Sequence, residues 1–291
     1  MSDAFDKLTE VVAKLRAPDG CPWDQKQTHE SLKPYLLEET YEVLETIDQK
    51  NPTKLREELG DVLLQVLLHA EIETQEQRFT IQDVVQDLTT KLIRRHPHVF
   101  DRDHAHSDAL NADQVVSQWE HIKRAERQKD NQPSSILESI PLALPALQRA
   151  YQMQKRATRV GFDWTEPQQV IDKLDEELNE LREATIQTKT QSSKSQTANE
   201  PSQAVPSAEI EHELGDVLFT LANMARFLKL NPEDALRKAT NRFAARFQYM
   251  ETQAAAAGQD LHALTLDEWD HWWEEAKKQE KFSTQENSIT P

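Results

Sequence analysis

The chain repeats part of its own sequence. The hexapeptide ELGDVL occurs at 58–63 and again at 213–218, and in both places an EExxE pattern precedes it, at 38–42 and at 176–180. A six-residue identity that keeps its order relative to a second shared pattern indicates an internal duplication. We therefore expect the 291 residues to fold as two tandem copies of one unit, a first half and a second half.

Both halves carry apolar residues at the spacing of helices. This spacing predicts one helix from Ser31 to about Lys50 and another after the Asn51-Pro52 pair, because Asn caps a helix and Pro suits its first position. A third helix is expected to start at Thr80. Only five glycines are present, which leaves little material for β-hairpin turns or glycine-rich phosphate loops. The sequence thus predicts an all-α fold of two tandem helical bundles.

A linker and an insertion set the expected domain limits. Pro, Ser and charged residues predict a linker at 131–144, which separates an N-terminal helical domain at 1–130 from a C-terminal one at 145–291. Between the two acidic patterns the second half is 17 residues longer than the first. The additional residues fall in a stretch rich in Ser, Thr and Gln, so a mobile insertion is expected at about 185–208.

The acidic residues of the two patterns are spaced to meet. Residues three and four apart share one face of a helix, and a short turn makes consecutive helices antiparallel neighbours. Converging carboxylates repel unless they are neutralised, and a set of oxygen ligands suits Mg²⁺ or Mn²⁺. A lone motif of this kind would most often be a solvated acidic face, but its recurrence within apolar helices favours a cation site. The acids concerned are Glu38, Glu39, Glu42, Glu58 and Asp61 in the first half and Glu176, Glu177, Glu180, Glu213 and Asp216 in the second.

A di-iron carboxylate site is the first alternative. Such sites use two ExxH motifs, and this region of the chain offers only Glu209 with His212. We discard this alternative because the second histidine is missing.

The charge balance limits the partners. With 34 Lys and Arg against 51 Asp and Glu, the formal net charge of −17 disfavours a nucleic-acid or an anionic membrane surface. No apolar run is long enough to span a bilayer, and the N-terminus lacks the basic and then apolar order of a signal peptide. The single Cys21 cannot form an internal disulfide. We expect a cytoplasmic protein with no nucleic-acid or membrane partner.

EExxE followed by ExxD resembles the pattern of the all-α nucleoside triphosphate pyrophosphohydrolases, and the flanking sequences resemble the MazG family. These flanking sequences are GCPWDQKQT at 20–28, LEETYEVLE at 37–45, RRHPHVF at 94–100 and RVGFDW at 159–164. The resemblance, which covers about 20–285, implies a nucleotide-binding enzyme that assembles with a partner subunit as a homodimer. It also implies Mg²⁺-dependent hydrolysis of NTPs, ATP included, and of dNTPs over a broad base range, to monophosphate and pyrophosphate. Mn²⁺ is the expected substitute for Mg²⁺.

The resemblance also implies which residues hold the metal. In the second half the ligands would be Glu177, Glu180, Glu213 and Asp216, and in the first half they would be Glu39, Glu42, Glu58 and Asp61.

Substrate-binding positions follow from the same resemblance. Lys173, Arg242 and Arg246 match positions that handle phosphate, and Trp273 matches an aromatic near the nucleoside. In the first half the two arginine positions become Lys91 and Arg95. Tyr35 stands where the second half has Lys173, so we expect the second site to carry most of the turnover.

The expected mechanism is attack of a metal-activated water on the α-phosphorus, with pyrophosphate as the leaving group. Lys173 and the arginines would neutralise the charge that develops on the phosphates. Glu176, next to the ligands, is the candidate base for the proton of the water. The alternative from another class is a non-catalytic helical scaffold for dimerisation or regulation.

Overall fold

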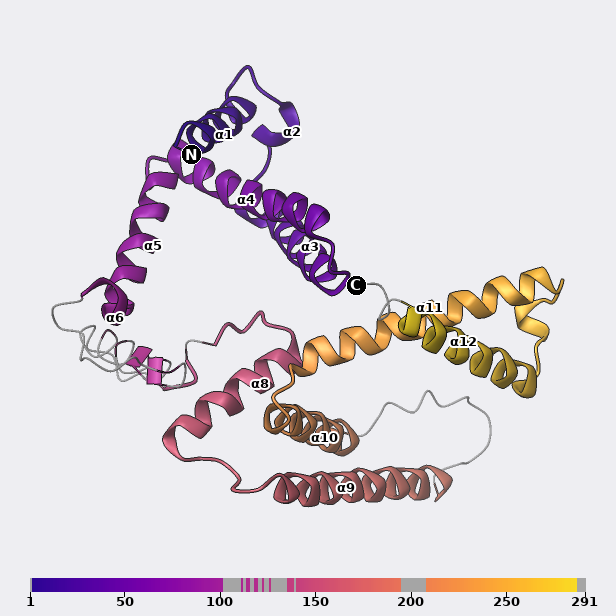
Figure 1. Cartoon of the computed structure of the whole chain (residues 1–291). Coiled ribbons are helices and arrows are strands. Elements are labelled where there is room, and N and C mark those ends of the chain that lie inside the picture. The colour runs from indigo at the N-terminus through magenta and orange to yellow at the C-terminus, as the bar shows by residue number, and fades with distance from the viewer. Residues whose placement is uncertain are drawn as a thin grey trace. The chain divides into compact units, whose positions relative to one another are not determined.

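The computed structural model describes most of the chain. The described residues are 2–101, 111, 114–115, 118–119, 122, 126, 135–138, 140–194 and 208–286, without the side chains of 2–3, 188–194 and 281–286. They form helices and no strand, so the all-α prediction is confirmed for this part of the chain (Figure 1). The chain divides into two compact units, Met1–Gln132 and Pro133–Pro291, and this division falls within the stretch expected as a linker. None of the described helices is long and apolar enough to cross a membrane.

Side-chain caps begin the main helices of the first unit. Asn51 accepts a hydrogen bond from the backbone N–H of Lys54, and Thr80 accepts one from that of Asp83, so both predicted starts are confirmed. Thr28 caps the preceding helix, which begins a little before the predicted Ser31. The helices are α1 (Ser2–Arg16), α2 (Pro22–Gln25), α3 (His29–Asp48), α4 (Pro52–Gln75), α5 (Ile81–Arg95) and α6 (Pro97–Phe100).

The core of the first unit lies at one end of the hairpin formed by α3 and α4. There the start of α3 and the second part of α4 pack with α1 and the start of α5. At the other end, which carries the EExxE and ExxD residues, the apolar side chains are less covered, and Leu59 is 52% exposed. The acidic patterns therefore lie on a stable hairpin but outside its core. The buried core residues are Val12, Leu32, Leu67, Leu68, Ala70, Ile72 and Ile81.

The motif GCPWDQKQT forms the turn that leads into α3. A Cβ on Gly20 would lie 2.3 Å from the carbonyl oxygen of Lys14, so only glycine fits there. Arg16 ties the turn to α4, since its guanidinium donates to the carbonyl of Gln27 at 3.2 Å and to the side chain of Gln75 at 3.1 Å. These contacts fix where α3 begins and hence the position of its acidic face.

The second unit repeats the hairpin with additional helices. Its elements are α8 (Ala146–Ala157), η1 (Thr158–Val160), α9 (Pro167–Lys194), α10 (Ala208–Phe227), α11 (Pro232–Ala256), η2 (Leu261–Ala263) and α12 (Leu266–Glu286). α9 and α10 pack side by side, as α3 and α4 do, and α8 packs on α10, where Gln154 donates to the carbonyl of Phe219 at 2.8 Å. α11 and α12 form a further hairpin (Figure 1).

The expected insertion at about 185–208 is shorter than the sequence suggested. α9 continues to Lys194, and residues 185–194 are therefore helical. These ten residues contain no Gly or Pro, so nothing in them interrupts a helix that is already formed. The rest of the predicted insertion, 195–207, lies outside the described residues.

Candidate functional site

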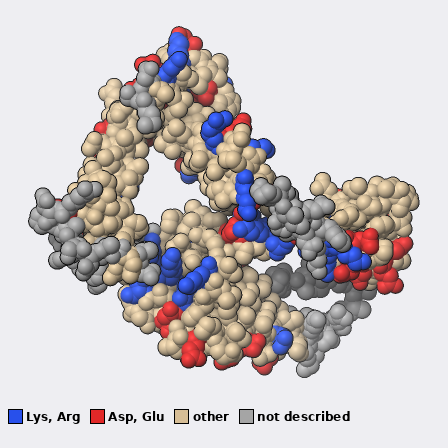
Figure 2. Space-filling view, in the orientation of Figure 1, with Lys and Arg blue, Asp and Glu red and all other residues tan. Residues whose placement is uncertain are grey.

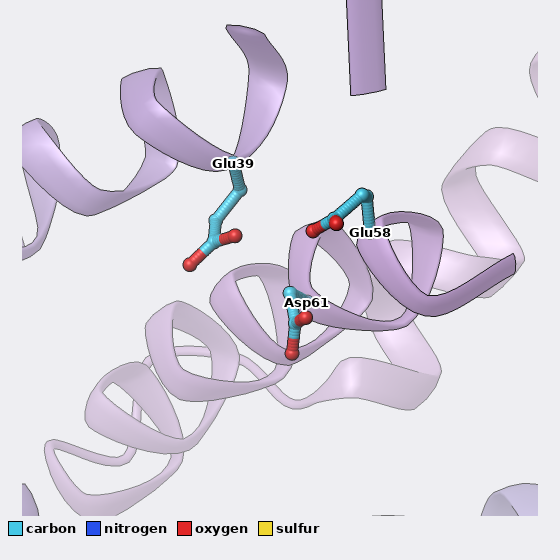
Figure 3. A group of neighbouring side chains, drawn as sticks. All are labelled: Glu39, Glu58 and Asp61. Atoms are coloured by element: carbon cyan, nitrogen blue, oxygen red, sulfur yellow. The ribbon is translucent and has the colours of Figure 1, made fainter. Parts of the chain in front are cut away.

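The acids of the first half converge between α3 and α4. One carboxylate oxygen from each of Glu39, Glu58 and Asp61 lies within 4.8 Å of the other two. Glu39 extends from α3 toward the two acids of α4 (Figure 3). We call these three residues the first cluster. Its side chains are half-buried, so solvent and a ligand can reach them.

The second half repeats this arrangement between α9 and α10. The oxygens of Glu177, Glu213 and Asp216 also lie within 4.8 Å of one another, and we call these residues the second cluster. Glu177 is buried, with 6% of its surface exposed, whereas the other two are half-buried. A buried carboxylate is costly without a partner, so this cluster needs positive charge more than the first does.

The remaining acid of each expected quartet lies at the edge of its cluster. Glu42 shares a hydrogen bond with Glu58, and Glu180 shares one with Glu177. Burial and then these contacts raise the pKa of Glu58 and of Glu180. Burial and the charges of Asp61 and Glu42 likewise raise the pKa of Glu39. Carboxylates that resist ionisation together are relieved when a cation binds among them.

Lys173 supplies positive charge to the second cluster. Its Nζ lies 2.8 Å from Oε1 of Glu177 and 2.8 Å from Oε1 of Glu176. These hydrogen bonds, that of Glu176 first, raise the pKa of Lys173, which keeps its ammonium charged. Glu176, the candidate base, is thus held by Lys173 on the exposed side of α9.

The corresponding position in the first half has no cation. Tyr35 lies one turn before Glu39, and its ring packs edge-on against Trp23 with 5.7 Å between ring centroids. Lys33, the nearest lysine in sequence, pairs with Glu30 at 2.6 Å instead. Among the described residues, no Lys or Arg forms an ion pair with Glu39, Glu42, Glu58 or Asp61.

The expected phosphate- and nucleoside-binding residues of the second half lie on α11 and α12. Arg246 donates to Oε2 of Glu280 from Nε at 2.8 Å and from Nη2 at 2.6 Å, and its guanidinium lies 5.3 Å from the ring centroid of Trp273. Arg242 is exposed one turn earlier on α11. In the described part of the chain neither arginine hydrogen-bonds or ion-pairs with the second cluster.

The first half repeats this arginine arrangement. Arg95 donates to Glu126 from Nη2 at 2.7 Å and from Nε at 3.4 Å, while Lys91 is exposed one turn earlier. Trp119 lies beside His96, the neighbour of Arg95, with 4.9 Å between ring centroids.

Reasoning from the acidic motifs missed Trp119, Glu126 and Glu280. A second sequence repeat could have found them, because WEHIKRAE at 119–126 and WEEAKKQE at 273–280 share Trp, Glu, Lys and Glu at the same spacing. Each segment places its last glutamate seven residues after the tryptophan; Glu126 binds Arg95 of α5, and Glu280 binds Arg246 of α11.

The donor chemistry of both clusters fits a hard divalent cation. Each cluster offers carboxylate oxygens from two helices and no sulfur or imidazole among the three residues. Acidic side chains also gather along α9 and at the outer end of the α11–α12 hairpin, with Lys and Arg scattered among them, as Figure 2 shows for one face. Of these acidic residues, those in the two clusters are arranged so that they could bind a cation.

Known proteins resemble this chain over nearly its whole length. Residues 27–100 and 165–250 match the family described as MazG nucleotide pyrophosphohydrolase domain. The nucleoside triphosphate pyrophosphohydrolase/pyrophosphatase MazG of Thermotoga maritima is 46% identical over 94% of this chain and 95% of its own length. The nucleoside triphosphate pyrophosphohydrolase of Escherichia coli strain K12 is 41% identical over 95% of this chain and 98% of its own. The two matched segments contain the two clusters.

Proposed function

Because the chain belongs to the MazG nucleotide pyrophosphohydrolase family, we propose that it hydrolyses nucleoside triphosphates to a monophosphate and pyrophosphate with Mg²⁺. The substrates are NTPs and dNTPs of broad base range. The observation that carries this proposal is the second cluster, in which three convergent carboxylates stand beside the ammonium of Lys173. Mg²⁺ and the ammonium of Lys173 allow an anionic substrate to bind a protein whose net charge is −17.

The residues of the second cluster hold the cation, with Glu180 as the further ligand. When bound, Mg²⁺ neutralises triphosphate oxygens and makes water a better nucleophile. The carboxylates come from two helices that pack along their length, so the site is held rigid before substrate arrives.

Basic side chains bind the phosphates in this proposal. Lys173 is already positioned by Glu176 and Glu177 and has a third N–H donor for a phosphate oxygen. Arg242 and Arg246 bind further phosphate oxygens, and Trp273 packs against the nucleoside. Glu176 accepts a proton from the attacking water. The oxygen of that water bonds to the α-phosphorus as the bond to pyrophosphate breaks. The first cluster, with Lys91 and Arg95, has the same layout without the lysine, and we propose that it binds a cation but contributes little turnover.

Homodimer formation is part of the proposal. Large apolar side chains of both hairpins remain exposed in one chain, including Leu37, Tyr41 and Leu59 of the first and Leu214 and Leu218 of the second. Exposed apolar faces of this extent indicate an interface. A second molecule covers them, and a mass in solution of one chain, measured by light scattering, would contradict this. We also propose a cytoplasmic location without a nucleic-acid partner, supported by the acidic charge balance.

Product analysis in isotopically labelled water tests the proposed reaction. The purified protein is incubated with Mg²⁺ and each NTP and dNTP in H₂¹⁸O, and the products are resolved by mass. Attack at the α-phosphorus places the label in the monophosphate and leaves pyrophosphate unlabelled. Diphosphate with orthophosphate, label in pyrophosphate, or no turnover would each defeat the proposal.

A further inference from the structure

The pairing of Arg246 with Glu280 is the strongest unassigned feature near the proposed substrate. Both the Nε and the Nη2 of Arg246 donate to one oxygen of Glu280, at 2.8 and 2.6 Å, across the α11–α12 hairpin. Charge-assisted contacts of this kind fix the plane of a guanidinium. Glu280 therefore determines how Arg246 is presented.

Trp273 packs against the same guanidinium. Its ring centroid lies 5.3 Å from the guanidinium carbon of Arg246 and 5.5 Å from the ring of Phe243, which packs it against α11. An arginine held over an indole face and by a carboxylate has little rotational freedom left to lose. In the described part of the chain Nη1 has no hydrogen-bond partner, so this nitrogen is left for a ligand.

A pairing of glutamate with arginine recurs in the first half. Glu126 accepts from Arg95 at 2.7 Å and also pairs with Arg94 at 2.7 Å, and the hydrogen bond from Arg95 is the main cause that lowers the pKa of Glu126. The glutamate stands seven residues after a tryptophan in both halves. A surface ion pair contributes little to stability, so its repetition across a duplicated fold points to use in binding.

We propose that Glu280 is a positioning residue for nucleotide hydrolysis: it holds Arg246 over the ring of Trp273 so that Nη1 faces a phosphate oxygen of the substrate. The inference rests on the proposed function, because it takes Arg246 as a phosphate-binding residue. Glu280 itself touches no substrate. Its effect on the substrate passes through Arg246, and this distinguishes it from a carboxylate that only stabilises the hairpin.

A double-mutant cycle tests this dependence. We expect Glu280→Gln to raise KM about 10-fold, with kcat changed less than about twofold, because a charged hydrogen bond that orders Arg246 is lost. Arg246→Ala should raise KM further. In the Arg246→Ala background, adding Glu280→Gln should change KM by less than about twofold, since no arginine is left to position. Glu275→Gln removes the same charge from α12, where Glu275 is 3.6 Å from Lys278, and should leave KM unchanged.

The same double-mutant cycle can be measured without turnover, from the Kd of each variant for a non-hydrolysable triphosphate with Mg²⁺ by calorimetry. A 10-fold weaker Kd in Glu280→Gln supports the proposal even if the product analysis defeats the proposed reaction. Three results would overturn it while leaving that reaction standing. They are an unchanged KM in Glu280→Gln, an equal increase in the Arg246→Ala background, and a lowered KM, which would show that Glu280 competes with phosphate. An unchanged KM in Arg246→Ala would overturn it as well, because Arg246 would then bind no phosphate.

Discussion

The two carboxylate clusters share their spacing but differ in what lies beside them. In the second half Glu177 is buried and its charge is met by Lys173 at 2.8 Å. In the first half Glu39 is half-exposed, and the equivalent position, Tyr35, packs against Trp23. The cation-binding geometry is thus kept in both halves, while the positive charge on the substrate side is kept in only one.

This difference indicates that the two halves differ in turnover but not in cation binding. Binding a divalent cation needs only convergent oxygens, which both hairpins supply. Stabilising charge on a transferred phosphate also needs a fixed cation from the protein, which the described first half lacks beside its cluster. The first cluster is therefore expected to bind metal without fast turnover.

The largest expected effect comes from removing divalent cations. A chelator should lower the rate of pyrophosphate release by about 1,000-fold or more, because both metal and nucleophile activation are lost. Adding Mg²⁺ back should restore the rate, and the measurement is release of pyrophosphate from ATP. Undiminished activity with excess chelator would show that the clusters are not the source of catalysis in either half.

Exchanging the residues beside the clusters should have the next largest effect. Lys173→Tyr should lower the turnover about 10- to 100-fold, because one charge-assisted contact to phosphate is lost. In a Glu180→Gln background, Tyr35→Lys should raise the residual turnover by giving the first cluster a lysine. If Lys173→Tyr retains full activity, the difference between the halves has another cause.

The sequence predicted those features that depend on local contacts. Asn51 and Thr80 cap helices as expected, because a cap needs only a side chain and a backbone N–H three residues later. Glu58 and Asp61 share a helix face by spacing alone, and a short turn brings α3 beside them.

The features that it did not predict depend on packing between helices. Glu280 lies 34 residues from Arg246, and no periodicity within α11 or α12 indicates that the two meet. Motif order also did not predict that, in the described part of the chain, Arg246 pairs with Glu280 and not with the second cluster. Local composition also placed the start of the insertion too early, because Ser, Thr and Gln are tolerated in a helix that has already formed.

The pH dependence of metal binding should separate the halves more finely. The pKa values of Glu39 and Glu58 are raised above the usual 4.5, and a cation must displace any protons that they hold. In Glu180→Gln, which removes the fourth acid of the second site, Mg²⁺ affinity at the first site should fall as the pH drops toward 4.5. In Glu42→Gln, which removes the fourth acid of the first site, the fall at the second site should be smaller, because the charge of Lys173 opposes the raised pKa of Glu180. Calorimetric titration of Mg²⁺ at a series of pH values checks this. Equal curves would contradict it.

The smallest expected effect concerns Glu73, a carboxylate that is paired with Arg78. A hydrogen bond from Arg78, together with one from His29, lowers the pKa of Glu73 from 4.5 to about 2. A lowered pKa stabilises the fold above 4.5, and this contribution is lost as the pH falls from 4.5 toward 2. Glu73→Gln should therefore be less stable than the parent at neutral pH, with the difference vanishing in acid. Urea unfolding across this range measures it, with Glu10→Gln, an exposed acid of α1, as the control. A pH-independent difference would show that the charge of Glu73 is not the cause.

Matched removal of the acid at the edge of each cluster tests the division between the halves most directly. Glu42→Gln and Glu180→Gln change equivalent positions by the same atoms, and pyrophosphate release from ATP is measured for both at saturating Mg²⁺. We predict that Glu180→Gln lowers turnover about 100-fold or more and that Glu42→Gln changes it by less than about twofold. A larger loss from Glu42→Gln would show that the first cluster, without a lysine beside it, is the main catalytic site.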